Sequence, residues 1–207
     1  MSTMIASYST AARAPQQWAT TVLSEHTTIL RAPLIKGEND REGTRFRLAS
    51  ITDMDDHGFL PVPQRVLHLA NAEPLARKYE LQDYDVLLTI VGTIGRITIV
   101  PPNRSEPWIS ASNMLIIRFH EERRANAVAF TMFMKGPRGR AILQELTHGT
   151  TIPIISKKAF AKTRIPQLTD EVRALSSELF EQERELYRQR AELLQKVYQL
   201  QATYPPE

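Results

Sequence analysis

The sequence predicts an α+β fold, in which one domain with a small mixed or antiparallel sheet and short helices precedes a long C-terminal coiled-coil helix. Two observations support this prediction. Short β-like and helical segments alternate along most of the chain, and a seven-residue apolar repeat begins after residue 169. The length of 207 residues fits one medium domain with an appendage, because a domain typically has about 150 residues.

The expected strands are short and rich in β-branched and aliphatic residues. The tetrapeptide from Gly92 to Gly95 separates two of them and predicts a hairpin, because glycine tolerates the backbone angles of a tight turn. We expect strands at residues 46–51, 65–69, 86–91, 96–100, 114–119 and 152–155, with a last short piece at Ile165 and Pro166.

The helical segments of the domain are marked by their flanking residues. Residues 125–134 form one expected helix. A second runs over residues 138–147, with Pro137 suited to its first turn and Gly149 just past its end. The segment 18–31 fits either a short helix or a helix that runs into a strand.

The last segment predicts one uninterrupted helix. Thr169 is a suitable N-cap, acidic residues follow it in the first turn, and neither glycine nor proline occurs again before Pro205. Apolar residues recur every seven positions, which is the spacing of a coiled-coil seam. The members of this heptad column are Val172, Leu179, Leu186, Leu193 and Leu200.

A helix of this length, about 48 Å at about 1.5 Å per residue, exceeds the domain to which it is attached. We therefore expect the heptad column to pack against the same helix of a second copy, which makes the chain a homodimer. The alternative is that the helix folds back along its own domain. A neighbouring column of Phe180, Tyr187 and Leu194 widens the apolar stripe.

Composition excludes several classes of protein. The absence of cysteine rules out a disulfide framework, cysteine-ligated zinc and a thiol nucleophile. No apolar run approaches the roughly 20 residues of a membrane span, so no membrane partner is expected. Residues 1–14 are rich in Ser, Thr and Ala and lack the apolar core of a secretory signal. We expect them to form a disordered tail on a soluble, cytoplasmic protein.

Familiar catalytic and metal-binding patterns are missing from the sequence. It contains no glycine-rich dinucleotide fingerprint, no phosphate-binding loop and no His-Glu-x-x-His zinc motif. The five histidines lack the spacing of metal ligands. Asp53, Asp55, Asp56 and His57 resemble a metal cluster, but the following Gly58 favours a solvated turn. We therefore expect a non-catalytic chain without a metal or cofactor of its own.

Positive charge is concentrated in the first part of the chain. The whole chain has 26 Lys and Arg residues and 23 Asp and Glu residues. Residues 167–207 contain five Lys and Arg and eight Asp and Glu, which gives this segment a net charge of −3. Residues 1–166 contain the other 21 basic and 15 acidic residues and have a net charge of +6, so this part is the one expected to meet a polyanion.

Basic residues interleave with small polar ones at the joints between segments, a composition suited to phosphate and base-edge contacts. For any single residue, a solvated surface charge is the simpler interpretation. Thr93, Arg96 and Asn113 are the candidates for reading bases. The full set of candidate DNA-binding residues is Lys36, Arg45, Arg47, Thr93, Arg96, Asn113, Lys135, Arg138, Lys157 and Lys158.

One stretch of the sequence resembles a known family. Residues 84–89 (YDVLLT), followed by residues 92–95 (GTIG), are similar to the GDVL…GTIG stretch of target-recognition domains in type I restriction–modification specificity subunits. Further pieces follow the family's order and extend the resemblance over residues 15–200. These pieces are residues 18–23, 46–60, 110–118, 149–160 and 165–166. The chain departs from the family after Pro166, where Gln167 and Leu168 replace the usual Pro-Pro-Leu segment.

The resemblance implies a DNA target-recognition domain over residues 15–166 and a dimerisation or spacer helix over residues 167–207. Specificity subunits are not catalytic. They read double-stranded DNA while adenine methyltransferase subunits, which bind S-adenosylmethionine, modify the target, and a restriction/translocase subunit can join them.

Family members usually carry two recognition domains and two spacer helices, so this chain resembles a half-length form. We expect it to homodimerise and to place the methyltransferase on an interrupted palindrome. Two alternatives stay open: the recognition module of a split single-site methyltransferase or type IIB-like system, and an adaptor that binds only protein through its coiled coil.

Overall fold

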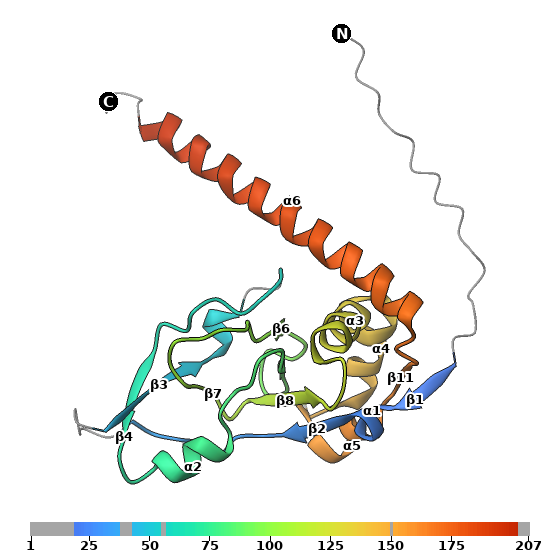
Figure 1. The fold of residues 1–207 in the computed structure, drawn as a ribbon, viewed down its shortest axis with the longest axis horizontal. Coiled ribbons are helices and arrows are strands. Elements are labelled where there is room, and N and C mark those ends of the chain that lie inside the picture. The colour runs from blue at the N-terminus through green and yellow to red at the C-terminus, as the bar shows by residue number, and fades with distance from the viewer. Residues whose placement is uncertain (1–18, 38–42, 55–56, 150, 203–207) are drawn as a thin grey trace.

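The computed structural model describes residues 19–37, 43–54, 57–149 and 151–202, and the tail expected at residues 1–14 lies outside them. The described part of the body contains a four-stranded sheet, a three-stranded sheet, two short two-stranded sheets and short helices, and a long helix runs along one side of it (Figure 1). The strands are β1 (Thr20–Val22), β2 (Thr27–Leu30), β3 (Thr44–Ala49), β4 (Val66–Leu69), β5 (Val86–Thr89), β6 (Ile97–Ile99), β7 (Trp108–Ser110), β8 (Met114–Phe119), β9 (Thr147–His148), β10 (Ile154–Ile155) and β11 (Arg164–Pro166). The helices are α1 (Leu23–His26), the 3-10 turn η1 (Ile51–Asp53), α2 (Glu73–Lys78), α3 (Arg123–Lys135), α4 (Pro137–Leu146), α5 (Lys157–Ala161) and α6 (Asp170–Ala202).

The central sheet has the strand order β2-β8-β5-β6, and every neighbouring pair in it is antiparallel. All four residues of β5 are buried, which explains why this strand reads as an apolar run without alternation. Its side chains point alternately to the two faces, so that Leu88 packs on the helices and Leu87 packs toward the second sheet. The central sheet is therefore covered on both faces.

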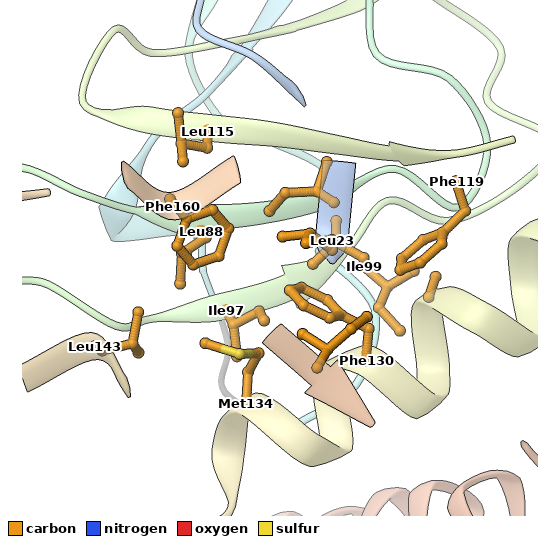
Figure 2. Close-up of a cluster of buried hydrophobic side chains, with 14 of the residues drawn as sticks. Leu23, Leu88, Ile97, Ile99, Leu115, Phe119, Phe130, Met134, Leu143 and Phe160 are labelled. Carbon is orange, nitrogen blue, oxygen red and sulfur yellow. The ribbon is translucent and has the colours of Figure 1, made fainter. Parts of the chain in front are cut away.

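The helical face of the central sheet holds the largest cluster of buried side chains. Figure 2 shows side chains of the central strands meeting Phe130 and Met134 of α3, with Leu143 of α4 and Phe160 of α5 at the edges. The rings of Phe119 and Phe130 meet edge to face with centroids 5.7 Å apart. This cluster fixes α3, α4 and α5 on one face of the sheet.

The second sheet is mixed, with the order β4-β3-β7. β3 pairs antiparallel with β4 and parallel with β7. Trp108 on β7 packs in the cluster behind the central sheet, whereas its neighbour Ile109 packs with Phe46 and Leu69 of the second sheet. Figure 1 shows β3 and β4 at one end of the body and α3 and α4 at the other.

The α+β class and most expected elements are confirmed. The hairpin predicted around Gly92–Gly95 exists, with Val86 opposite Ile99 in antiparallel register. The strand at 114–119 has the expected bounds, and both expected helices lie within two residues of prediction. The 18–31 segment differs, because its described part is a strand, one helical turn and a second strand.

The sequence did not predict α2, β7 or α5. Lys157 and Lys158, expected at a joint between segments, lie in the first turn of α5 instead. The hydroxyl of Ser156 accepts a hydrogen bond from the Ala159 amide at 3.5 Å, and Phe160 is fully buried. One N-cap and one buried aromatic side chain are thus enough to define this short helix.

The long helix α6 begins as predicted, because the Thr169 hydroxyl accepts a hydrogen bond from the amide of Val172 at 3.3 Å. Its first half packs on α3. The ring of Phe180 is fully buried and meets Phe59 edge to face at 5.5 Å, and Tyr187 stacks on His57 at 3.9 Å. The column that includes Phe180 and Tyr187 therefore faces the body of its own chain.

The heptad column faces away from the body. Leu179 is 44% exposed, Leu186 66%, Leu193 61% and Leu200 66%, whereas Val172 is half-buried. Every residue from 188 to 200 is exposed, and Figure 1 shows this half of α6 running clear of the body. The helix thus folds back along its own domain through one column and leaves the heptad column uncovered. Among the residues that the structure describes, no helix is both long and apolar enough to cross a membrane.

Candidate nucleic-acid interface

Two turns lie side by side at one end of the central sheet. The amide of Gly92, in the β5–β6 turn, donates a hydrogen bond to the carbonyl of Pro153 at 3.1 Å, and Val91 forms a β-bridge with Ile154. Gly92 has a φ of +77°, which favours glycine at this position. These contacts hold the exposed Thr93 beside the turn between β9 and β10. We call these two turns the paired turns.

Exposed basic residues lie on both sides of the β9–β10 turn in the chain. Arg138 and Arg140 lie on α4, and Lys157 and Lys158 lie on α5. None of these four side chains forms an ion pair with a described residue. Because both helices pack on the same face of the central sheet, the four charges belong to one layer of the fold. Uncompensated cations of this kind are suited to phosphate contacts.

A cleft of about 770 Å³ lies between the β5–β6 turn, the junction of α3 with α4, and α6. It brings together two of the predicted residues, Arg96 and Lys135. The guanidinium of Arg96 donates to the carbonyls of Ile51, at 3.2 Å, and Met54, so it also holds the η1 segment in place. The ammonium of Lys135 forms an ion pair with Glu183 of α6 at 2.8 Å.

The remaining predicted residues lie apart from this cleft. Arg45 and Arg47 belong to β3, and both form ion pairs with Glu106, at 3.2 Å for Arg45. Lys36 is exposed on the segment after β2. Asn113 precedes β8, and its side-chain oxygen is buried with no hydrogen-bond partner among the described residues. The ten predicted residues therefore do not form one continuous patch.

Sequence reasoning missed a buried ion-pair cluster at Asp85, which belongs to the GDVL-like stretch. Asp85 is fully buried and accepts hydrogen bonds from Arg118 at 2.9 and 2.7 Å and from Arg123 at 3.2 Å. The amide of Gln82 donates to the same carboxylate at 2.8 Å. The cluster ties β5 to β8 and to the start of α3, so this aspartate is structural. The signal in the sequence was a single acid at the start of an apolar strand.

Tyr84 precedes Asp85 and stands where the family stretch has glycine. Its φ is +64°, in the left-handed region that favours glycine. The Tyr84 side chain packs against the main core, and its ring lies 6.5 Å from that of Phe59. The glycine of the family stretch thus corresponds to a real conformational requirement of this turn.

Two residues of the suspected metal cluster, Asp53 and His57, make structural contacts in the described part of the chain. Asp53 forms a capping box with Ser50 and accepts a hydrogen bond from the Gln64 amide at 3.1 Å. His57 stacks on Tyr187, while Asp55 and Asp56 lie outside the described residues. Within the described ranges, no three acidic or histidine side chains are placed to hold a metal ion.

Two exposed carboxylates have a pKa below the usual value, and both lie away from the cleft. The Thr44 hydroxyl, and then Arg77, lower the pKa of Glu73 on α2 by hydrogen bonding to its carboxylate. Arg188, and then Gln189, lower the pKa of Glu185 on α6 in the same way. The ion pairs of these carboxylates with Arg77 and Arg188 lie on the surface of single helices and contribute little to stability.

No family model matches the chain, and no curated protein matches it either. Solved structures do match. The S subunit of the type I restriction–modification system of M. genitalium superposes with a TM-score of 0.53 and 11% identity over 91% of this chain. The fold is that of a type I specificity subunit.

Two further structures agree. The HsdS subunit of Thermoanaerobacter tengcongensis gives a TM-score of 0.54 at 18% identity over 92% of this chain. A chain from a study of complex assembly and conformational transition in the type I R-M system gives a TM-score of 0.56 at 17% identity over 93% of this chain. The match covers 44%, 45% and 44% of the three solved chains, so this chain spans less than half the length of each.

Proposed function

We propose that the chain is a sequence-specific DNA-recognition subunit of a type I restriction–modification system, and that it homodimerises through α6. The observation that carries this proposal is the exposed heptad column on a chain whose fold corresponds to less than half of an S subunit. A dimer of this chain would provide two recognition domains and two long helices. The family resemblance implies the same two recognition domains and two spacer helices.

The symmetry of the column supports an antiparallel dimer. Leu179 and Leu193 lie at equal distances from Leu186 along the helix, and so do Val172 and Leu200. In an antiparallel pair, Leu186 would meet its own copy at the two-fold axis, and every other member would meet an apolar partner. The four leucines of the column are exposed along one side of the helix, so a partner helix can reach them.

The body would supply the contacts with double-stranded DNA. The basic residues on α4 and α5 would contact phosphates, and the exposed Thr93 in the paired turns would reach base edges. The chain would not be an enzyme and would bind no cofactor. Adenine methyltransferase subunits would carry S-adenosylmethionine, and a restriction/translocase subunit would join them in the cytoplasm.

Replacing Lys157 and Lys158 together by alanine is expected to weaken binding to duplexes of any sequence. Each lost phosphate contact should make the log–log salt dependence shallower by about 0.9. The measurement is a fluorescence titration of a random-sequence duplex at several salt concentrations. The matched control replaces Lys78 of α2 and Lys196 of α6, which removes the same charge elsewhere. Equal slopes for wild type and the α5 variant would exclude these lysines from the interface. No duplex binding by the wild type would favour a protein-only adaptor.

The methylated site is expected to be an interrupted palindrome. The two domains of a closed dimer are identical and related by a two-fold axis, so they would read identical half-sites in inverted orientation. The 33 residues of α6 span about 50 Å, which allows about 15 base pairs between half-site centres. Mapping methylated adenines in cells that express the chain with its methyltransferase tests this. A continuous or asymmetric motif would contradict the homodimer and favour a single-site or type IIB-like system.

A further inference from the structure

The carboxylate of Glu183 projects from α6 into the cleft between the β5–β6 turn and the α3–α4 junction. It lies 2.8 Å from the ammonium of Lys135 and 3.4 Å from the imidazole of His57. The Lys135 side chain is only 15% exposed, and the carboxylate compensates its charge. An acid on the dimerisation helix thus neutralises a residue of the candidate DNA-binding set.

The rest of this cleft is suited to an anion. Its lining includes Arg96, Lys135 and Arg140, with the neutral polar residues Gln144 and Thr147 beside them. Among the described residues that line the cleft, Glu183 is the acidic one. Arg140 is exposed and forms no ion pair with a described residue. Another anionic group can therefore bind here when the Glu183 side chain moves out of the cleft.

We infer that this cleft is a subsite for a backbone phosphate of DNA, and that Glu183 occupies the place of the phosphate in the free protein. The inference rests on the proposed function, because it assumes that DNA is the ligand. Carboxylate and phosphate oxygens accept the same charge-assisted hydrogen bonds from lysine and arginine. The ion pair seen in the free chain is then the internal substitute for the contact that DNA makes.

The exchange would couple DNA binding to the position of α6. Binding of the phosphate releases Glu183 from Lys135, which weakens one contact of α6 with the body. By linkage, a helix held more firmly against the body binds DNA less tightly. The buried Phe180 and the hydrogen bond from Arg173 to Asn126, at 3.2 Å, do not involve the cleft. They would keep α6 docked during the exchange.

The test compares Glu183→Gln with Glu181→Gln. Glutamine keeps the size of the side chain at position 183 and one accepting oxygen, but it removes the charge, so Lys135 becomes available to a phosphate. Glu181 lies on the same helix and pairs with Arg124 and Arg184, outside the cleft. Both variants therefore change the net charge equally, and only one changes the cleft. The probe is a fluorescent duplex of random sequence, titrated at several salt concentrations.

Glu183→Gln should bind the duplex about fivefold more tightly than wild type at low salt, because no carboxylate competes with the phosphate for Lys135. The Glu181→Gln variant should bind with nearly the wild-type affinity. Equal effects of the two substitutions, or no effect of Glu183→Gln, would overturn the subsite while leaving DNA binding intact. Absence of binding by all three proteins would overturn both the subsite and the proposed function. Thermal unfolding shows whether each variant folds, and Glu183→Met replaces the glutamine variant if that one does not.

Discussion

Replacing Asp85 with alanine is expected to lower the free energy of unfolding by about 3–5 kcal/mol, the usual cost of removing one partner from a buried ion pair. Asp85 is fully buried and neutralises both Arg118 and Arg123. Without it, two guanidinium groups lose their counterion where water reaches them poorly. The amide of Gln82 also loses its acceptor.

Urea denaturation of wild type and variant measures this difference. Asp83→Ala is the matched control, because Asp83 is two residues away and pairs with Arg104 at 2.8 Å, but its side chain is 45% exposed. Because Asp83 is partly exposed and Arg104 keeps its hydrogen bonds to the carbonyls of Leu81 and Pro101, we expect Asp83→Ala to cost only about 1 kcal/mol. If Asp85→Ala costs no more than Asp83→Ala, the buried cluster does not hold β5 against β8 and α3. In that case the aspartate of the GDVL-like stretch needs another explanation.

Local patterns were enough to predict the hairpin, the two helices after it and the long helix. Each depends on residues that are close in sequence, such as Gly92 and Gly95 in the turn or Pro137 at the start of α4. The strand β7 gave no such signal, because it has three residues and is defined by its parallel pairing with the distant β3. Its existence depends on tertiary contacts that no short window contains.

Charge counting identified a basic body but could not tell which cations are compensated. Arg47 forms an ion pair with Glu106, which lies 59 residues further along the chain. Lys135 forms an ion pair with Glu183, which lies 48 residues further along. Both pairs depend on how distant segments fold together. Only the three-dimensional structure distinguishes these paired basic residues from exposed ones without a described ion-pair partner, such as Lys157 and Lys158.

The apolar stripe of α6 was predicted as one surface, but it has two roles. Phe180 and Tyr187 looked like a widening of the heptad column. In the structure they face α3 and the 57–59 segment, because their column is rotated toward the body. A heptad pattern gives the spacing of the apolar side chains but does not say which neighbour each column meets. The exposed column is consequently the one available to a partner.

Leu186→Glu is expected to abolish or strongly weaken the proposed dimer. In the antiparallel pair, Leu186 meets its own copy at the two-fold axis, so the substitution would bury two like charges together at a cost of several kcal/mol. Sedimentation equilibrium measures the change. Ala191→Glu is the control, because residue 191 is exposed and lies outside the heptad column. A Leu186→Glu variant as dimeric as wild type would exclude this geometry.

Single cysteines can determine the orientation of the two helices, because the chain contains no cysteine of its own. In the antiparallel dimer, Leu179 of one copy lies opposite Leu193 of the other. A Leu179→Cys protein mixed with a Leu193→Cys protein should therefore form a disulfide-linked dimer under mild oxidation, whereas neither variant should cross-link alone. A parallel, in-register pair would give the reverse result, with each variant cross-linking to itself and the mixture forming no mixed dimer. Only the antiparallel result would place the two recognition domains at opposite ends of the helix pair, which the expected spacing of about one helix length between the half-sites requires.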